Sequence, residues 1–383
     1  MSEMAQTDGV IRRGIDQGLH PGAQVCVWHD GECAVDAGWG EAAPGRTMTA
    51  DTRTLWMSAG KPITAVALAQ RVEAGEVDWD DPVAEYVPEF AAQGKEAVTL
   101  RHVLTHTGGF RSAALRYPEQ SWDEAIAAVC DARLETGWRV GETAGYHAHA
   151  GWNIVGKVLE VCSGQALGEH LREAVLRPWG MDRTWIGVPA EPSGVYDAVE
   201  PTLAEVVDSS RSPEQPATPT GYHERAWVTG QRPGGNVYGP ASDLARFYRG
   251  LLNGGELDGK RLLSPEAVAD LTARHRRDTE DRTFRAVMDW GLGFMVNNRR
   301  HDAANAELRG ISSQTDPATP YGFGPAAGDS AYGHCGNQTS AGFADPEHGL
   351  VVVMVFNGMP GEKRHQRRMH ETLGAVYDDL GLG

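Results

Sequence analysis

The chain has 383 residues, of which 41% are hydrophobic, and a formal net charge of −17 from 35 basic and 52 acidic residues. This length and apolar content suffice for a substantial core, as one large domain or two intimate ones. The negative charge argues against nucleic acid or an anionic membrane as a partner and favours a small-molecule substrate. The sequence contains no run of 18 apolar residues, so we expect no membrane-spanning helix.

The N-terminal residues and the cysteines both favour a cytoplasmic location. Residues 1–8 are polar and acidic, without the basic start and apolar centre of a secretory signal peptide. The five cysteines are scattered and include no C-x-x-C pair, which is typical of free thiols in a reducing compartment. We therefore expect a cytoplasmic protein, whose oligomeric state the sequence leaves open.

Hydrophobic periodicity and turn residues predict helices and strands in a clear order along the chain. Helices are predicted at residues 1–19, 58–75, 122–162 (interrupted around 137–145), 241–253 and 362–380. Strands are predicted at residues 23–28, 32–38, 331–336, 340–344 and 350–356. The strands thus lie near both ends of the chain, and the middle is mostly helical.

This order predicts an α+β fold with one antiparallel sheet made from both termini and flanked by the N- and C-terminal helices. The sheet-containing α/β part then covers about residues 1–75 and 285–383. A mostly helical region, about residues 76–284, is inserted between its halves. We expect the whole of 1–383 to form a single unit.

Ser58 and Lys61 form an S-x-x-K pair at the start of a predicted helix. Residues three apart share a helix face, with a rise of about 4.5 Å between them. A hydroxyl beside an amine at the positive end of a helix is a workable nucleophile and base. The pair alone is weak evidence, because an N-cap serine followed by a surface lysine has the same spacing.

His102 and His106 are four residues apart and could chelate a metal ion on a helix. The zinc-protease pattern also requires a glutamate after the first histidine, and Val103 stands at that position. We therefore interpret both histidines as structural. We expect neither a metal nor a cofactor.

Five stretches in chain order carry a resemblance to one family: 58–61 (Ser-Ala-Gly-Lys), 99–109, 255–265, 290–294 and 332–350. Together they resemble the serine β-lactamase and penicillin-binding protein superfamily, in its class C-like esterase and D-alanyl-D-alanine carboxypeptidase branch. Residues 334–336, His-Cys-Gly, match the His-x-Gly that often replaces this family's Lys-Thr-Gly. The matches span most of residues 20–360, and they imply a β-lactamase/transpeptidase-like fold.

The resemblance implies that Ser58 is the nucleophile and that Lys61 and Tyr146 move its proton. Residues 146–148, Tyr-His-Ala, resemble a variant of the family's second motif, in which a phenol with a lowered pKa takes the serine proton. The alternatives are that Tyr146 only packs between helices, or that His147 or His149 titrates instead. The backbone amides of Ser58 and Asn337 are implied to form the oxyanion hole.

The resemblance also indicates the kind of substrate. Ala148 replaces the asparagine that holds the substrate amide in β-lactamases, and His334 replaces the lysine that binds the penicillin carboxylate. Both departures favour esters over lactams. Substrate contacts are expected from His334, Gly336, His147 and Trp152, with pocket walls from 110–120, 190–235 and 297–330. Tyr222, Trp227 and Tyr238 either line this pocket or simply pack.

We therefore predict a serine hydrolase that cleaves carboxylic esters of small molecules through an acyl-enzyme on Ser58. The alternatives are acyl transfer to a small-molecule acceptor, β-lactamase or D-alanyl-D-alanine carboxypeptidase activity, and an inactive ligand-binding protein. A Ser-His-Asp hydrolase is disfavoured, because Trp56 stands where its G-x-S-x-G motif needs glycine. Cys335 has no helix N-terminus to activate it as a nucleophile.

Overall fold

The structure is a computed structural model that describes residues 4–190, 194–211, 215–311 and 316–383. Its α-helices are α1 (Ala5–Asp16), α2 (Lys61–Glu73), α3 (Leu100–Leu104), α4 (Trp122–Asp131), α5 (Ala150–Ser163), α6 (Leu167–Leu171), α7 (Val195–Val199), α8 (Arg225–Val228), α9 (Ala241–Leu252), α10 (Pro265–Thr272), α11 (Asp302–Arg309) and α12 (Glu362–Asp379). Its long strands are β1 (Gly22–His29), β2 (Glu32–Ala43), β14 (Tyr332–Gly336), β15 (Ser340–Asp345) and β16 (Leu350–Phe356). The short strands are β3 (Arg46–Thr47), β4 (Thr54–Leu55), β5 (Trp185–Ile186), β6 (Val207–Asp208), β7 (Thr218–Pro219), β8 (Val237–Gly239), β9 (Glu256–Leu257), β10 (Lys260–Arg261), β11 (Glu280–Asp281), β12 (Ala286–Val287), β13 (Met295–Val296) and β17 (Gly358–Met359).

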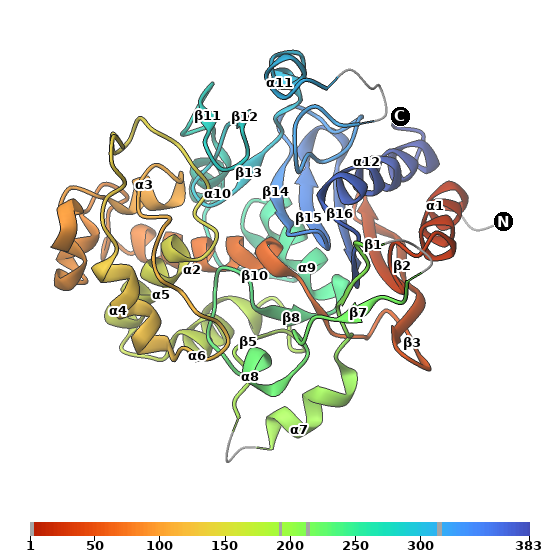
Figure 1. Ribbon diagram of the computed structural model, residues 1–383, viewed down its shortest axis with the longest axis horizontal. Coiled ribbons are helices and arrows are strands. Elements are labelled where there is room, and N and C mark those ends of the chain that lie inside the picture. The colour runs from red at the N-terminus through yellow and green to blue at the C-terminus, as the bar shows by residue number, and fades with distance from the viewer. Residues whose placement is uncertain (1–3, 191–193, 212–214, 312–315) are drawn as a thin grey trace.

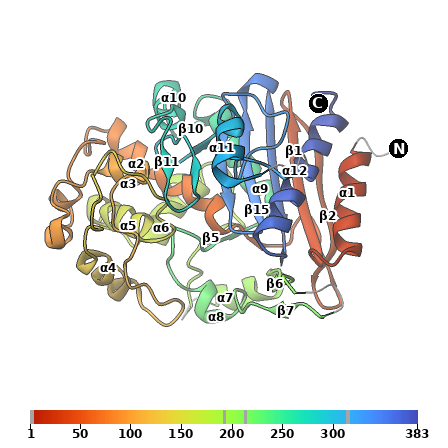
Figure 2. The same cartoon turned by 45° about the horizontal axis from the view of Figure 1, so that its top comes forward.

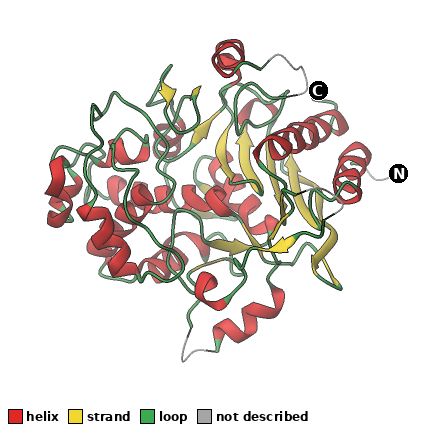
Figure 3. Ribbon diagram, in the orientation of Figure 1, coloured by secondary structure: helices red, strands yellow, loops and turns green. Residues whose placement is uncertain are grey.

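A seven-stranded antiparallel sheet joins the two ends of the chain, in the order β13-β14-β15-β16-β1-β2-β3. Strand β1 pairs with β16, so that Ala23 lies opposite Phe356 and His29 opposite Leu350. Figure 1 shows the first strands in red beside the last strands in blue, with helices α3 to α6 on the other side of the molecule. The predicted α+β architecture with a sheet from both termini is confirmed (Figure 3).

The central strand β16 is buried on both faces, because helices cover the sheet on each side. Val351, Val353 and Val355 belong to the core that includes α9, whereas the alternating residues Val352 and Met354 belong to the core under α1 and α12. A strand buried on both faces needs a continuous apolar run, and residues 350–356 read Leu-Val-Val-Val-Met-Val-Phe. Figure 2 shows the sheet between α9 on one side and the α1–α12 pair on the other.

The predicted helices and strands are helices and strands in the structure, but several of them begin or end at other residues. The first helix covers Ala5–Asp16 rather than 1–19, and residues 1–3 lie outside the described part of the chain. The predicted helix at 122–162 is two helices, α4 and α5, separated by a longer irregular segment than expected. The segment 190–235 contains the short elements α7, β6, β7 and α8, and its residues 191–193 and 212–214 are outside the description.

Helix α9 belongs to the sheet layer, although it lies inside the predicted helical insertion of 76–284. Its Leu244 and Tyr248 pack against the same core as the sheet residues Val353 and Val355. The division into an α/β part and an inserted helical part stays a prediction. In the described ranges, no helix is both long and apolar enough to cross a membrane.

Candidate active site

Ser58 lies in a short 3₁₀ turn, η1 (Met57–Gly60), that runs directly into helix α2. Met57, just before the serine, has a φ of 50°, a left-handed conformation that costs a non-glycine residue about 1–2 kcal/mol. The buried indole of Trp56 donates a hydrogen bond to the carbonyl of Gly239, with 2.8 Å between nitrogen and oxygen. The turn is therefore held in a strained conformation by the packing of its neighbours.

Lys61, the first residue of α2, is completely buried beside Ser58. Its Nζ lies 2.7 Å from Ser58 Oγ, and it also donates to the carbonyl of Gly234. No ion pair joins Lys61 to a carboxylate in the described ranges. Burial without a counter-ion disfavours the charged amine and lowers the pKa of Lys61 well below its usual value. A neutral amine beside the serine hydroxyl can accept its proton.

Tyr146 lies in the irregular segment before α5 and forms a hydrogen bond with Ser58. Its ring stacks on Trp290, with 5.7 Å between the ring centres, and lies 4.7 Å from the imidazole of His106. Burial raises the pKa of Tyr146, and the hydrogen bond with Ser58 only partly opposes this effect. The prediction that the Tyr146 phenol has a lowered pKa is therefore wrong. Tyr146 stays protonated, and the lowered pKa belongs to Lys61.

A buried ion pair holds the backbone of Tyr146 in place. Asp281 Oδ1 accepts the backbone N–H groups of Tyr146 at 3.1 Å and Phe284 at 3.1 Å. Asp281 Oδ2 lies 3.1 Å from the guanidinium of Arg276, and both side chains are almost fully buried. Arg276 also donates to the carbonyl of Thr105 at 3.0 Å. The carboxylate thus connects the Tyr146 segment to the loop that carries Phe284.

Strand β14 lies directly against the Ser58 turn. A Cβ atom on Gly336 would lie 2.5 Å from the carbonyl oxygen of Trp56, so only glycine permits this contact. Ser340, at the start of β15, donates to the same carbonyl at 2.6 Å. Asn337, the next residue after Gly336, lines the cavity beside Ser58. The strand pair and the serine turn are therefore one rigid wall.

His334 on β14 presents a hydrogen-bond acceptor to the site. Its Nδ1 lies 2.8 Å from the carbonyl oxygen of Cys335, and a carbonyl can only accept, so Nδ1 carries the proton. Burial and the nearby Lys61 lower the pKa of His334 well below its usual value, so the ring is neutral. Nε2 is then unprotonated and buried, and no described residue forms a hydrogen bond with it.

A cavity of 280 Å³ opens beside Ser58. The residues of its wall are Leu55, Met57, Ser58, Tyr146, Ala148, His149, Tyr222, Trp227, Gly235, Asn236, Phe284, Met295, Tyr321, His334, Cys335 and Asn337. Among these described residues there is no aspartate, glutamate, lysine or arginine. Since burial also lowers the pKa values of both histidines, to about 3 for His149, the wall carries no formal charge at neutral pH.

A family profile described as Beta-lactamase matches residues 7–376. The chain belongs to this family.

Esterases are among the relatives of the chain within the family. Esterase/beta-lactamase LipL of Mycobacterium tuberculosis is 30% identical over 333 residues, which cover 79% of this chain and 76% of LipL. Esterase EstB of Burkholderia gladioli is 29% identical over 395 residues, which cover 93% of this chain and 92% of EstB. The solved structure of a family VIII carboxylesterase superimposes with a TM-score of 0.76 at 27% identity, covering 99% of this chain and 98% of the other. The resemblance predicted from sequence and the β-lactamase-like fold are confirmed.

Three of the residues expected to contact substrate do not line the cavity. Gly336 packs against the Trp56 carbonyl instead, which corrects its expected contact. His147 points away from the cavity, and its buried Nε2 accepts the backbone N–H of Phe110 at 3.1 Å. Trp152 is 1% exposed and lies under Lys61, with 5.9 Å between Nζ and the ring centre. For His147 and Trp152 as well, the expected substrate contact is corrected.

The predicted pocket walls are correct in two of the three segments. Tyr222 and Trp227 come from residues 190–235, and Tyr321 comes from residues 297–330. Residues 110–120 contribute nothing to the wall, although Tyr117 packs behind His149 with 5.6 Å between ring centres. Tyr238 is buried, and its hydroxyl donates to the Tyr222 carbonyl at 2.6 Å.

Sequence reasoning missed three contributors to the site: Asp281, Gly234 and the position of His149 on the wall. Gly234 accepts hydrogen bonds from both Lys61 and Ser58, and a Cβ atom on it would lie 2.8 Å from the Ala148 carbonyl. The Gly-Gly pair at 234–235 was a signal of close backbone approach within a long loop. Nothing in the sequence around Asp281 distinguishes it from a surface acid.

Cys335 and the two histidines of the discarded metal motif have structural roles. Burial raises the pKa of the Cys335 thiol, which argues against a thiolate nucleophile. His102 Nδ1 accepts the backbone N–H of Thr99 at 3.1 Å and caps helix α3. His106 is fully buried against Tyr146 and Trp290.

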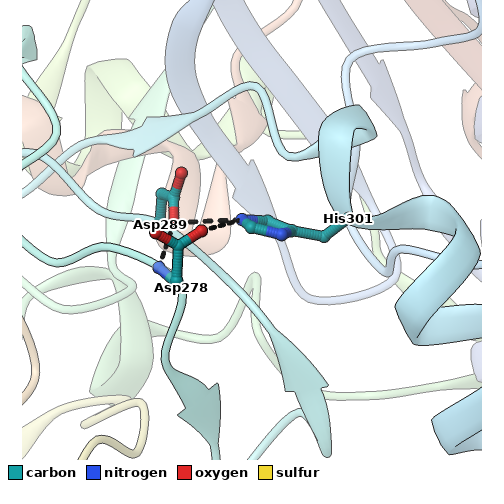
Figure 4. A group of neighbouring side chains, drawn as sticks. All are labelled: Asp278, Asp289 and His301. Atoms are coloured by element: carbon teal, nitrogen blue, oxygen red, sulfur yellow. Dashed lines mark hydrogen bonds and ion pairs between the residues drawn. The ribbon is translucent and has the colours of Figure 1, made fainter.

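Asp278, Asp289 and His301 form a cluster with the spacing of metal ligands (Figure 4). Arginines already neutralise its buried carboxylate: Asp289 Oδ2 lies 3.1 Å from Arg274 Nε and 2.9 Å from Arg300 Nε. Asp289 Oδ1 lies 3.1 Å from His301 Nε2 and accepts the backbone N–H of Asp278 at 2.8 Å. A metal ion would have to displace these cations, so we interpret the cluster as a structural ion-pair network.

We predict that Asp281→Asn lowers the free energy of unfolding by about 3–5 kcal/mol, because it leaves the buried Arg276 charge without its counter-ion. Urea denaturation followed by circular dichroism measures this change. The control is Glu142→Gln, which removes the exposed pair with Arg139, whose side chains are 66% and 77% exposed, and should cost less than about 1 kcal/mol. Equal midpoints for the two variants would contradict the prediction.

Proposed function

We propose that this protein hydrolyses carboxylic esters of small, uncharged molecules through an acyl-enzyme on Ser58. The observation that carries the proposal is the buried Lys61 amine, 2.7 Å from Ser58 Oγ and with a lowered pKa. The protein is a serine hydrolase of the β-lactamase family, and relatives named as esterases support ester cleavage in general. The residues, their roles and the substrate class are our proposal.

In the first half-reaction, Ser58 Oγ attacks the ester carbonyl carbon while its proton passes to the neutral Lys61 amine. The bond between the carbonyl carbon and the alkoxy oxygen then breaks. Tyr146 hydrogen-bonds with Ser58 and remains protonated, so it can donate its proton to the departing alkoxide and be reprotonated from Lys61. In the second half-reaction water attacks the acyl-enzyme, the proton returns by the same route, and the carboxylic acid leaves.

The negative charge that develops on the carbonyl oxygen needs donors that are already in place. We assign this role to the backbone amides of Ser58 and Asn337. The contact of Gly336 with the Trp56 carbonyl supports the assignment, because it brings the two amide-bearing segments together. His334 Nε2, an acceptor on the same strand, can bind a donor group of the substrate or the attacking water.

The uncharged cavity wall supports neutral esters as substrates. A carboxylate-bearing lactam would lose its hydration in this cavity without meeting a cationic side chain, and an unpaired buried charge is costly. Ala148 offers no amide group to a peptide-like substrate. The apolar side chains of Leu55, Met295 and Phe284 favour an aliphatic or aromatic acyl group.

Acyl transfer to an alcohol is a second candidate, favoured by the aromatic side chains of Tyr222 and Trp227 on the cavity wall. Apolar surface beside the acyl-enzyme can hold an organic alcohol in place of water. Product analysis after turnover of p-nitrophenyl butyrate, with and without added 1-butanol, separates the two. Butyl butyrate as the main product would identify a transferase, and butyric acid as the main product would identify a hydrolase.

We predict that Ser58→Ala reduces kcat for p-nitrophenyl butyrate by about 10⁴-fold or more, because the acyl-enzyme cannot form. The matched control is Ser163→Ala, at the end of α5, which should keep wild-type turnover. Mass spectrometry after treatment with a fluorophosphonate should find one adduct, on Ser58. Wild-type turnover in Ser58→Ala would reject the assignment.

We further predict how kcat/KM depends on pH. The active form has a neutral Lys61, so kcat/KM should rise with pH and become constant above the pKa of Lys61. Because burial lowers that pKa well below its usual value, the plateau should be reached well below pH 10. Lys61→Arg should be inactive over the whole range, because a guanidinium stays protonated. A rate that keeps rising beyond pH 10 would contradict this role.

The same burial has a cost in stability. The pKa of Lys61 is lower in the folded than in the unfolded protein. At a pH between these two pKa values, folding releases the proton of the amine. The free energy of unfolding therefore rises with pH across this range. At neutral pH the burial of the amine therefore opposes folding. We predict that Lys61→Met, which removes the amine, raises Tm at pH 7 while it abolishes turnover; differential scanning fluorimetry checks the shift. A lower Tm in this variant would contradict the argument.

A further inference from the structure

Arg368, on helix α12, is a buried cation without an acidic partner. Its side chain is 3% exposed, and in the described ranges no carboxylate lies within ion-pair distance of it. Burial lowers the pKa of Arg368 to about 9, which still leaves the guanidinium charged at neutral pH. An unpaired buried charge is costly, so such a residue needs several hydrogen-bond acceptors around it.

Those acceptors come from three separate segments of the chain. Arg368 donates to the backbone carbonyls of Leu19 at 3.2 Å, Gly358 at 3.2 Å and Gln338 at 3.0 Å. It also contacts the Nδ1 atoms of His20 at 3.1 Å and His365 at 3.0 Å. Burial lowers the pKa values of both histidines, so their neutral rings can accept from the guanidinium.

The Gln338 carbonyl belongs to the turn between β14 and β15, which also carries Asn337. The N–H of Thr339 closes this turn on the Gly336 carbonyl at 3.3 Å, and Gln338 has a φ of 50°, in the left-handed region. The side-chain Oε1 of Gln338 accepts the N–H of Gly361 at 2.7 Å, just before α12. Helix α12 and the residue before it therefore hold both the backbone and the side chain of Gln338.

We propose that Arg368 is a positioning residue that fixes the 336–339 turn, so that the backbone amide of Asn337 faces the oxygen of the reacting carbonyl. Asn337 lines the cavity beside Ser58, whereas Arg368 does not. Arg368 acts through the turn and touches neither the substrate nor Ser58. This inference rests on the proposed function, since it assigns the support of the oxyanion hole of that same site.

The expected signature is a loss of transition-state stabilisation rather than of substrate binding. A displacement of about 1 Å at an oxyanion donor costs about 10²-fold in rate, and removal of one donor about 10²–10³-fold. We therefore expect Arg368→Met to lower kcat for p-nitrophenyl butyrate by about 10- to 100-fold, with KM changed by less than about threefold. Arg368→Lys, which keeps the charge and part of the bonding, should retain more of the kcat.

The matched control is Tyr377→Phe on the same helix. The Tyr377 hydroxyl is buried and donates to Asp345 at 2.7 Å, at the far end of β15 from the turn. This variant loses a buried hydrogen bond between α12 and the sheet but leaves the turn intact. It should keep kcat within twofold of the wild-type value. All variants are assayed at a temperature where circular dichroism shows them folded.

A second variant keeps the proposal testable if Arg368→Met does not fold. Gln338→Ala retains Arg368 and its bond to the backbone carbonyl, and removes only the side-chain bond to Gly361. It should lower kcat several-fold, again with little change in KM. In every folded variant, the Ki of phenylboronic acid, which forms a tetrahedral adduct with the serine, should rise by about the same factor as kcat/KM falls.

The outcomes distinguish this inference from the proposed function. If the wild-type enzyme turns over the ester and Arg368→Met or Gln338→Ala, when folded, keeps kcat within twofold, the inference is overturned and the proposed function stands. The same holds if the losses match that of Tyr377→Phe. If the wild-type enzyme neither turns over esters nor forms the Ser58 adduct, the proposed function fails and the inference fails with it. A selective fall in kcat with a parallel rise in boronate Ki supports it.

Discussion

The lysine amine at the centre of this site is buried, and none of the described residues supplies a counter-ion, so the surrounding structure has to keep water and acids away from it. Lys61 is surrounded by Tyr146, Trp152 and the Gly234 carbonyl, none of which compensates a full positive charge. In the proposed mechanism the protein thereby obtains a base at the cost of stability, a common trade at catalytic positions. The buried acid nearest to Tyr146 does not act as a counter-ion for Lys61. Asp281 is paired with Arg276, and its other oxygen accepts the backbone N–H of Tyr146.

The wall around the serine comes from segments far apart in the chain, and each is held by short-range contacts. The strained Met57 precedes Ser58, Gly336 permits the approach of β14, and Ser340 ties the next strand to the same carbonyl. Because these contacts involve the backbone, the geometry of the site depends on the sheet more than on any one side chain. The sheet in turn depends on α12, whose Arg368 reaches into the turn beyond Gly336.

Much of this architecture could be predicted from sequence, because the sheet strands and the long helices have clear periodic patterns. The meeting of Ser58, Lys61 and Tyr146 followed from the order of several motifs. The direction of the Tyr146 pKa shift could not be predicted, because it depends on burial of the ring by Trp290 and other residues distant in sequence. His147 was misplaced because α5 begins only at Ala150, so His147 lies in an irregular segment whose side-chain directions follow no sequence period. Asp281 and Tyr146 are 135 positions apart and lie in two loops without periodicity. No local sequence pattern therefore predicts their contact.

The pairing of β1 with β16 has a consequence for how the chain acquires this structure. The backbone N–H of Gly22 donates to Asn357, which lies 335 positions later. During synthesis on the ribosome, β1 and β2 emerge long before the strand that completes the sheet, and their hairpin has to wait with an open edge. Closing so long a loop is entropically costly, and exposed strand edges promote aggregation. Folding should therefore be slow, and production in cells should benefit from low temperature or added chaperones.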